Sequence, residues 1–269
     1  MLHTEWFIIK FGSGNLMFNR LESIKNIRQK LTKGMVSVGT WQQIPHASIS
    51  EILGQAGFDW VTVDLEHGSI GIEQLPDLFR AIELGGTLPL ARIASSRVRD
   101  CKQALDAGAG GVIAPMIENA EQMEGIRQAC CWPPMGRRGV GFSRANLFGK
   151  YFEKYNEEAQ TPFLIAQIEH INAVNNLEKI LEVKGLDAII VGPYDLSASM
   201  GITGKFDGDD FISVMDRIIY LCKKYKVPCG EHVVKPDPNL LEKRIDQGYQ
   251  LLAYSTDAVF LHTFGKRPI

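Results

Sequence analysis

Short apolar runs alternate with amphipathic segments along most of the 269-residue chain. Each run is only four or five residues long and mostly apolar on both faces, which is typical of parallel strands covered by helices on each side. Eight runs predict strands at residues 35–39, 60–63, 88–91, 111–114, 163–166, 188–191, 227–230 and 251–254.

Helical spacing fills several of the gaps between these runs. It predicts helices at Ile49–Ala56, Arg99–Ala107, Ala173–Leu181 and Asp209–Tyr225. Repeated strand–helix units indicate a parallel sheet, and eight of them favour a closed (β/α)8 TIM barrel over an open doubly wound sheet. No Gly-x-Gly-x-x-Gly sequence follows the first strand, which weighs against a dinucleotide-binding fold.

The length suits a single barrel domain. We expect residues 1–34 to form an N-terminal extension and a first helix, and residues 35–269 to form the barrel. The apolar run at residues 6–9 is too short for a signal sequence or a membrane span, so we interpret the N-terminus as an extension or a non-native leader. The long Pro- and Gly-containing segment at residues 127–160 predicts a functional loop.

Charge and cysteine content exclude several classes of protein. The formal net charge is −2, and no basic surplus indicates a nucleic-acid partner. No stretch is long enough to cross a bilayer. The five cysteines are scattered without a C-x-x-C pair, which argues against a disulfide scaffold and a four-cysteine zinc site and predicts a cytoplasmic protein.

Polar residues gather directly after four of the predicted strands. In a barrel these positions meet at the C-terminal rim, where catalytic groups lie. The sequences concerned are Asp64-Leu65-Glu66-His67-Gly68, Arg92, Gln167-Ile168-Glu169 and Gly192-Pro193-Tyr194-Asp195.

These residue types indicate metal-assisted chemistry. Glu169 and Asp195 suit a hard divalent ion, with Mg²⁺ expected first and Mn²⁺ or Co²⁺ as alternatives, or they form a salt-bridged rim pair. Arg92 could hold a developing enolate oxygen, or form a structural ion pair. His67 lies close to Asp64 and could act as a general base, although a lone histidine is more often structural.

A helix start is predicted around Asp195-Leu196-Ser197. Its free backbone N–H groups could receive a substrate carboxylate, or Asp195 or Ser197 could simply cap the helix. The remaining histidines are interpreted as structural or surface residues. Of these, His46 and His232 are expected near the barrel mouth, and His170 is expected to point away from Glu169.

Four motifs together resemble the HpcH/HpaI aldolase family, which has a TIM barrel of the phosphoenolpyruvate/pyruvate group and commonly forms hexamers, as trimers of dimers. The resemblance covers roughly residues 35–260, and its motifs are FDWVTVDLEHG, PPMGRRGVG, AQIEH and VGPYDLSASMG. It departs in DLEHG, in His170 and in Tyr194, where small residues are common, so the substrate pocket is expected to differ.

The resemblance also implies roles for individual residues. His67 would be the base, Arg92 would stabilise the transition state, and Glu169 and Asp195 would bind the metal. The substrate would be contacted by Gln167 and by the segment that contains Gly192, Pro193, Tyr194, Asp195 and Ser197.

The family's further acid, which raises the basicity of the histidine, falls on Asp106. Asp106 is expected near the C-terminal end of a helix, far from its own rim, so it could act only across a subunit interface. Asp64 is an alternative partner for His67.

The sequence therefore predicts a metal-dependent lyase that reversibly cleaves a 4-hydroxy-2-oxo acid into pyruvate and an aldehyde. Its partners would be these small molecules and further copies of itself, without nucleic acid or membrane. A related metal–enolate lyase, an oxaloacetate decarboxylase or a macrophomate-synthase-like enzyme is an alternative. A non-catalytic barrel that binds a keto acid is a third possibility.

Overall fold

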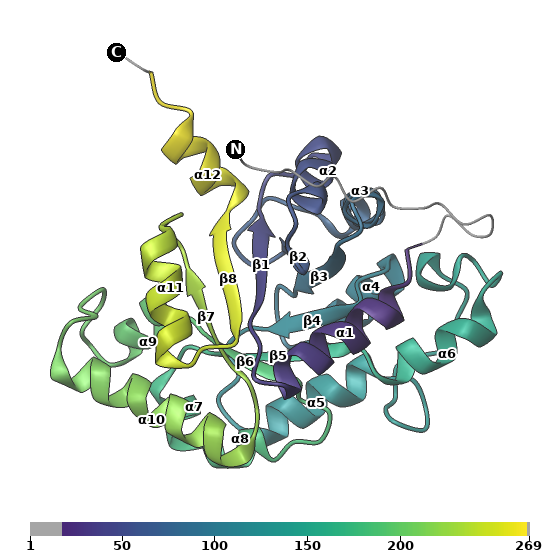
Figure 1. Ribbon diagram of the computed structural model, residues 1–269. Coiled ribbons are helices and arrows are strands. Elements are labelled where there is room, and N and C mark those ends of the chain that lie inside the picture. The colour runs from purple at the N-terminus through teal and green to yellow at the C-terminus, as the bar shows by residue number, and fades with distance from the viewer. Residues whose placement is uncertain (1–17, 268–269) are drawn as a thin grey trace.

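A computed structural model describes residues 18–267, in which eight parallel strands close into a barrel in chain order (Figure 1). This confirms the predicted (β/α)8 barrel. The strands are β1 (Ser37–Gln42), β2 (Trp60–Asp64), β3 (Leu88–Arg92), β4 (Gly111–Ala114), β5 (Phe163–Ile168), β6 (Ala188–Val191), β7 (Cys229–Val233) and β8 (Leu251–Thr256).

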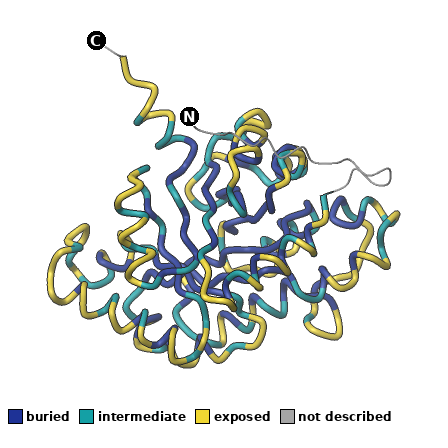
Figure 2. Tube along the Cα trace, viewed as in Figure 1, coloured by how far each residue is buried: buried dark blue, intermediate teal, exposed yellow. Residues whose placement is uncertain are grey.

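Helices surround the barrel and bury their inner faces against it, while their outer faces are exposed (Figure 2). They are α1 (Arg20–Thr32), α2 (Ala47–Gln55), α3 (Leu75–Leu84), α4 (Val98–Ala107), α5 (Ala120–Cys130), α6 (Phe152–Gln160), α7 (Ile171–Asn175), α8 (Leu177–Leu181), α9 (Pro193–Ser199), α10 (Asp209–Tyr225), α11 (Pro238–Gln247) and α12 (Asp257–Phe264). Two 3₁₀ turns, η1 (Ile72–Gln74) and η2 (Arg144–Asn146), complete the described elements.

Four predicted segments differ from the structure. β1 begins two residues after the start of the predicted strand and extends to Gln42, and β7 begins only after Pro228. The single helix predicted over residues 173–181 is wrong, because the chain forms α7 and α8 on either side of Asn176. The segment 127–160 is not only a loop, since it contains the end of α5, η2 and α6.

Alternating side chains fill the inside of the barrel. Successive residues of a strand point to opposite faces, so inward positions recur every second residue. The inward rows contain Trp60 of β2, Leu90 of β3, Ile165 of β5 and Ile190 of β6, all of them at most 1% exposed. Because the same rows continue to the strand ends, they bring the next polar residues onto one rim.

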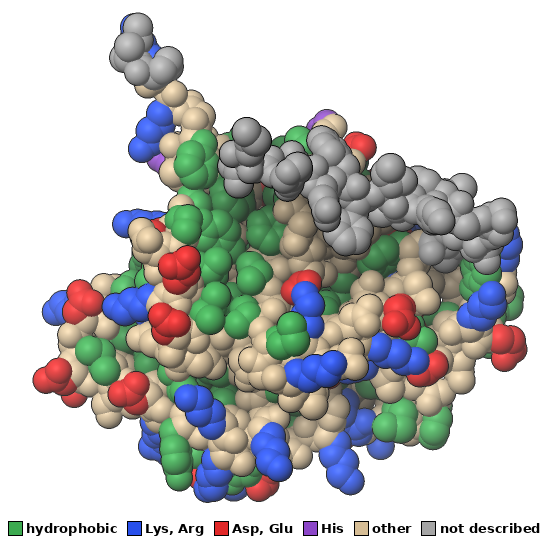
Figure 3. All heavy atoms as spheres, viewed as in Figure 1, with side chains coloured by type: hydrophobic (Ala, Val, Ile, Leu, Met, Phe, Trp, Pro, Cys, Tyr) green, Lys and Arg blue, Asp and Glu red, His purple; other side chains and the backbone are tan. Residues whose placement is uncertain are grey.

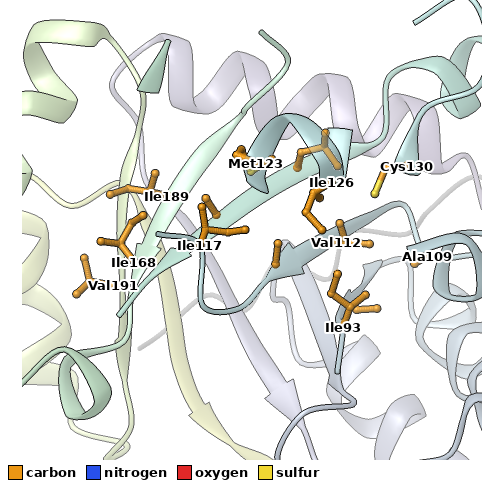
Figure 4. Close-up of a cluster of buried hydrophobic side chains, with 14 of the residues drawn as sticks. Ile93, Ala109, Val112, Ile117, Met123, Ile126, Cys130, Ile168, Ile189 and Val191 are labelled. Atoms are coloured by element: carbon orange, nitrogen blue, oxygen red, sulfur yellow. The ribbon is translucent and has the colours of Figure 1, made fainter. Parts of the chain in front are cut away.

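A second apolar layer lies between the strands and the outer helices. Figure 4 shows Val112 of β4, Ile168 of β5 and Ile189 of β6 beside Met123 and Ile126 of α5. All five side chains are at most 1% exposed. These strands are therefore apolar on both faces, which is why their short runs could be recognised in the sequence.

Helix α1 closes the N-terminal end of the barrel. Ile24, Ile27 and Leu31 are at most 5% exposed and pack with the inward side chains of the strands. Ion pairs join this helix to the barrel, with Arg20 Nε 2.6 Å from Glu158 and Arg28 Nε 2.6 Å from Asp187. The first helix is thus part of the barrel core; residues 1–17 of the expected extension lie outside the described residues.

The last helix does not follow this arrangement. α12 extends away from the barrel at its C-terminal end instead of lying against the outer face of β8 and β1 (Figure 1). Its Leu261 and Phe264 are 55% and 73% exposed. Within residues 18–267, no helix is both long enough and apolar enough to cross a membrane.

Candidate active site

A cavity of about 320 Å³ lies at the C-terminal rim, where the sequence predicted the site. Seven of the predicted residues line it: His67, Arg92, Gln167, Gly192, Pro193, Tyr194 and Asp195. Its volume is in the range of small-molecule sites. A larger cavity of about 840 Å³ is lined by Arg28, Pro162 and Asp187, near the starts of the strands, and contains none of the predicted residues. The smaller cavity is therefore the candidate active site.

Arg92 is held rigidly at the floor of this cavity. β2 and β3 pair in register, so Asp64 lies beside Arg92. The guanidinium donates to both Asp64 oxygens, at 2.8 Å from Nε and 2.6 Å from Nη2, and its Nη1 lies 3.1 Å from Glu66. The ion pair considered for Arg92 is thus present, and it fixes the guanidinium at the cavity wall, where it can also meet a substrate oxygen.

Asp64 is a partner of Arg92 and contacts His67 only through its backbone. It is fully buried and also accepts hydrogen bonds from the Gln43 amide at 2.9 Å and the His67 N–H at 3.3 Å. Burial raises the pKa of the Asp64 carboxyl, but the hydrogen bonds and charge of Arg92 outweigh burial, and this pKa lies below its ordinary value. Asp64 therefore remains a carboxylate.

Two residues at the end of β1 complete the surroundings of Arg92. The Arg92 guanidinium lies 4.2 Å from the centroid of the Trp41 ring, a cation–π contact. Gln43 lines the cavity, and its backbone N–H donates to Asp257 at 2.9 Å. The sequence prediction missed both residues because it ended the first strand at Gly39. The observed strand continues three residues further, to Gln42, so that it includes Trp41 and is followed directly by Gln43.

Glu169 is a buried carboxylate with few protein partners. It is 2% exposed, and its Oε1 accepts from the Met116 N–H at 2.7 Å while its Oε2 accepts from the Gln167 amide. Burial raises its pKa, and the charge of Asp195 raises it further, against the effect of those two hydrogen bonds. The alternative of a salt-bridged rim pair is wrong, because among the described residues no cationic side chain lies within 4 Å of Glu169 or Asp195. Arg92 affects Glu169 only through its charge, from a greater distance.

These features fit a divalent metal ion. The buried Glu169 carboxylate is repelled by the charge of the exposed Asp195, and a cation between them would relieve this repulsion. Space is also present, because Gly192 lacks a side chain where a Cβ would lie 2.8 Å from Glu169 Oε2. The Gln167 Oε1 is buried without a hydrogen-bond partner. No group of three His, Cys, Asp or Glu ligands occurs within residues 18–267, so water and substrate would complete the coordination.

Glu66 is a third acidic residue that the sequence analysis did not assign a role. Burial raises the pKa of Glu66, and the neighbouring Glu169 carboxylate contributes in the same direction, although Arg92 opposes it. Glu66 thus lies close enough to Glu169 for the two carboxyl groups to interact, and it shares Arg92 with Asp64. The sequence already indicated that Glu66 lies at the rim, because it follows β2 closely and precedes His67.

His67 is exposed at the mouth of the cavity, in the turn that follows β2. The turn is held by Asp64, which accepts from the backbone N–H groups of Glu66 and His67. Since no hydrogen bond of its imidazole is found within residues 18–267, the ring is available to a substrate.

Four predicted site residues do not line the cavity. Asp64 and Glu169 are buried behind the lining residues Arg92 and Gln167, to which they are hydrogen-bonded, whereas Asp106 and Ser197 serve other parts of the structure. Asp106 lies at the C-terminal end of α4, where its Oδ1 is 3.2 Å from Nη1 of the buried Arg138. Burial raises the pKa of Asp106, and Arg138 opposes the shift. Ser197 is buried and supports the loop after α9, donating to the Tyr194 carbonyl at 2.8 Å and accepting from the Gly204 N–H at 3.0 Å.

Helix α9 begins earlier than the sequence predicted. Gly192 is its N-cap and Pro193 its first residue, so neither Asp195 nor Ser197 caps it. Asp195 lies in its first turn and faces the cavity. Tyr194 is 52% exposed and packs edge-on against Phe206, 5.0 Å between centroids.

The sequence profile of the family described as HpcH/HpaI aldolase/citrate lyase matches residues 37–262. The chain belongs to this family. Among characterised relatives of the HpcH/HpaI family, the hydroxypyruvate/pyruvate aldolase of Roseobacter denitrificans is 33% identical over 90% of this chain and 95% of its own length. The 2-dehydro-3,6-dideoxy-6-sulfogluconate aldolase of Pseudomonas putida is 36% identical over 86% and 90%.

Solved structures agree with this membership. An HpcH/HpaI aldolase/citrate lyase family protein from Burkholderia cenocepacia superposes with a TM-score of 0.83 and 29% identity, covering 88% of this chain and 95% of that chain. The resemblance inferred from the four motifs is confirmed. This HpcH/HpaI protein is a carbon–carbon lyase.

Proposed function

We propose that the protein reversibly cleaves a 4-hydroxy-2-oxo acid into pyruvate and an aldehyde. The observation that supports this best is a cavity lined by Asp195, the fixed cation Arg92 and the accessible base His67. A second carboxylate without a cationic partner, Glu169, is buried against the lining residues Gln167 and Gly192. Such a set can bind a 2-oxo acid and stabilise the charge of an enolate. Relatives that act on hydroxypyruvate, pyruvate and a 2-dehydro sugar acid are consistent with it.

The metal would be held by Glu169 and Asp195, with Mg²⁺ proposed first and Mn²⁺ or Co²⁺ as substitutes. When bound, it supplies Lewis acidity toward the oxygens of the 2-oxo acid. The free backbone N–H groups in the first turn of α9, which belong to Tyr194 and Asp195, point to the place of the substrate carboxylate. Gln167 and Gly192 form the adjacent wall of the cavity.

His67 and Arg92 have different roles in the cleavage of the C3–C4 bond. His67 removes the proton from the C4 hydroxyl, and the C3–C4 bond electrons move to C3 as the aldehyde forms. Arg92 donates to the oxygen on which the enolate charge develops, and its bidentate pairing with Asp64 keeps it in place before the reaction begins. Proton return to C3 gives pyruvate.

The test is an assay of pyruvate release from a panel of 4-hydroxy-2-oxo acids, before and after removal of metal. We expect turnover in the presence of Mg²⁺, loss of at least about a hundredfold after chelation, and recovery on addition of Mg²⁺, Mn²⁺ or Co²⁺. Activity that survives full removal of metal would contradict the proposal. Turnover of oxaloacetate alone would favour the decarboxylase alternative, and metal-dependent binding without turnover would favour a binding protein.

We propose further that the protein is a homo-oligomer, a hexamer built as a trimer of dimers, and cytoplasmic. The helix after the last strand normally joins the outer ring of a barrel, whereas α12 here leaves apolar side chains exposed over β8 and β1 (Figure 3). A second copy of the chain would cover this apolar surface, because its own α12 carries the same exposed apolar side chains. The five cysteines are all free and buried, consistent with a reducing compartment.

Asp106 would then reach His67 from a neighbouring copy. Arg138, its ion-pair partner, belongs to the same segment as Phe142 and Phe148, which are 73% and 69% exposed. Exposed aromatic side chains of this kind favour contact with another protein surface.

Leu261→Asp on α12 tests the proposed assembly. We expect the mass measured by light scattering to fall below that of the wild type, because a charge would be buried against the second copy. Ile212→Asp on α10, where the side chain is 45% exposed, is the matched control and should leave the mass unchanged. A wild type that is already monomeric, or a Leu261→Asp protein of unchanged mass, would refute the role of α12.

A further inference from the structure

His232 occupies an inward position in the candidate active site and has no role in the proposed reaction. It lies on β7 in register with Ala253 of β8, two residues after Gly230, and it lines the cavity. The sequence analysis expected it near the barrel mouth, with a structural or surface role. The structure brings it next to Trp41 and thereby close to Arg92.

Two contacts fix the orientation of the His232 ring. It stacks on Trp41 with 5.0 Å between centroids and 7° between planes. Its Nε2 lies 3.2 Å from the carbonyl oxygen of Ser255. Since a carbonyl oxygen can only accept a hydrogen bond, Nε2 must carry the proton.

The ring is neutral at physiological pH. Burial lowers the pKa of His232 to about 4, and the charge of Arg92 acts in the same direction. A neutral imidazole with its proton on Nε2 has an unprotonated Nδ1 that can only accept.

Nδ1 has no donor within residues 18–267, since the Ser255 carbonyl is the hydrogen-bond partner found for this ring. It is also not fully buried, and the ring to which it belongs lines the cavity. Val234 and Val259 line the same cavity, as do the polar side chains of Gln43 and Thr256. A fixed acceptor without a protein donor favours a bound molecule that brings its own donor.

We propose that Nδ1 of His232 accepts a hydrogen bond from a substrate hydroxyl group, so that the enzyme prefers hydroxylated substrates to their deoxy analogues. The inference rests on the proposed aldolase function and specifies its substrate class. The hydroxyl belongs either to C3 of the 2-oxo acid, as in hydroxypyruvate, or to the aldehyde, as in glycolaldehyde. A site built to bond a hydroxyl discriminates against the analogue that lacks it, because its polar group is then left without a partner.

The experiment measures aldol addition for four pairs, in which pyruvate or hydroxypyruvate is combined with acetaldehyde or glycolaldehyde. We expect the wild type to favour one hydroxylated partner by about tenfold in kcat/KM. His232→Leu should abolish this preference by raising KM for the hydroxylated partner, with the pyruvate–acetaldehyde pair changed less than threefold. His232→Asn, whose amide oxygen can take the place of Nδ1, should restore part of the preference.

The substrate pair whose kcat/KM falls in His232→Leu shows whether the bonded hydroxyl belongs to the 2-oxo acid or to the aldehyde. Equal losses for hydroxylated and plain substrates in His232→Leu would overturn the proposal and leave the ring as a support for Trp41. Unchanged discrimination would overturn it as well. If no pair reacts, the aldolase proposal fails, and calorimetric titration of the Mg²⁺-loaded protein decides the inference: it is overturned if hydroxypyruvate binds no tighter than pyruvate and glycolaldehyde no tighter than acetaldehyde.

Discussion

Glu169→Gln is expected to lower kcat/KM for aldol cleavage by about a thousandfold and to abolish tight binding of the metal. Lewis-acid stabilisation of a developing charge is worth several kcal/mol, and each 1.4 kcal/mol corresponds to a factor of ten in rate. The substitution removes the charge and retains the shape. Its amide can still accept from the Met116 N–H, and the Gln167 amide can turn, because its Oε1 has no partner to lose.

Three measurements separate loss of metal from loss of fold in this variant. Circular dichroism should match the wild type, calorimetric titration with Mn²⁺ should show at least tenfold weaker binding, and the rate should not recover at high metal concentration. Glu118→Gln is a control on the same rim, where Glu118 contacts Asn172 outside the cavity. It should change the rate less than twofold. A Glu169→Gln protein with near-normal turnover would disprove the metal assignment.

Arg92→Lys is expected to reduce kcat by about a hundredfold to a thousandfold while KM changes little. Lysine keeps the positive charge but loses both the fork that binds two Asp64 oxygens and the flat contact with Trp41. The loss falls on kcat because Arg92 acts on charge that develops in the transition state.

The matched control is Arg99→Lys on α4, whose guanidinium bonds only to Gln103 within the described residues and should tolerate the exchange. Thermal unfolding at several pH values adds a second readout. The Asp64–Arg92 pair lowers the folded-state pKa of Asp64, so its stabilising contribution is present above the unfolded pKa and is lost as the pH falls through the folded value. A kcat within threefold of the wild type in Arg92→Lys would exclude the proposed role.

The fold was predictable because the barrel strands are apolar on both faces. β2 to β6 begin at their predicted residues, and their ends carry Asp64, Arg92, Gln167 and Glu169 onto one rim as expected. β1 and β7 were predicted at the wrong residues because they are not apolar along their whole length. Their C-terminal halves contain polar residues that are buried against partners distant in sequence.

Glu231 illustrates this limit. It is 4% exposed because Arg244 of α11 lies 2.8 Å away, a pairing that no local pattern reveals. His232 was expected near the barrel mouth with a structural or surface role, and only the structure shows that its ring lines the cavity. In β1, Thr40 is buried against the distant Tyr254 carbonyl, and ending the predicted strand before Thr40 left out Trp41. The charged residues of the site could be predicted, whereas the aromatic and amide residues that hold them depend on tertiary packing.

The position of α1 separates the start of the family profile from the start of the unit that folds. The family profile begins at residue 37, whereas the barrel core begins with Ile24. Cutting the chain where the profile starts would remove the helix that closes the N-terminal end of the barrel and leave Trp60, Leu88 and Phe163 in contact with water. It would also leave Glu158 and Asp187 without their arginines. Chimeras and truncations that exchange active sites within this family must therefore carry α1 with the strands it seals, even though it contributes no residue to the chemistry.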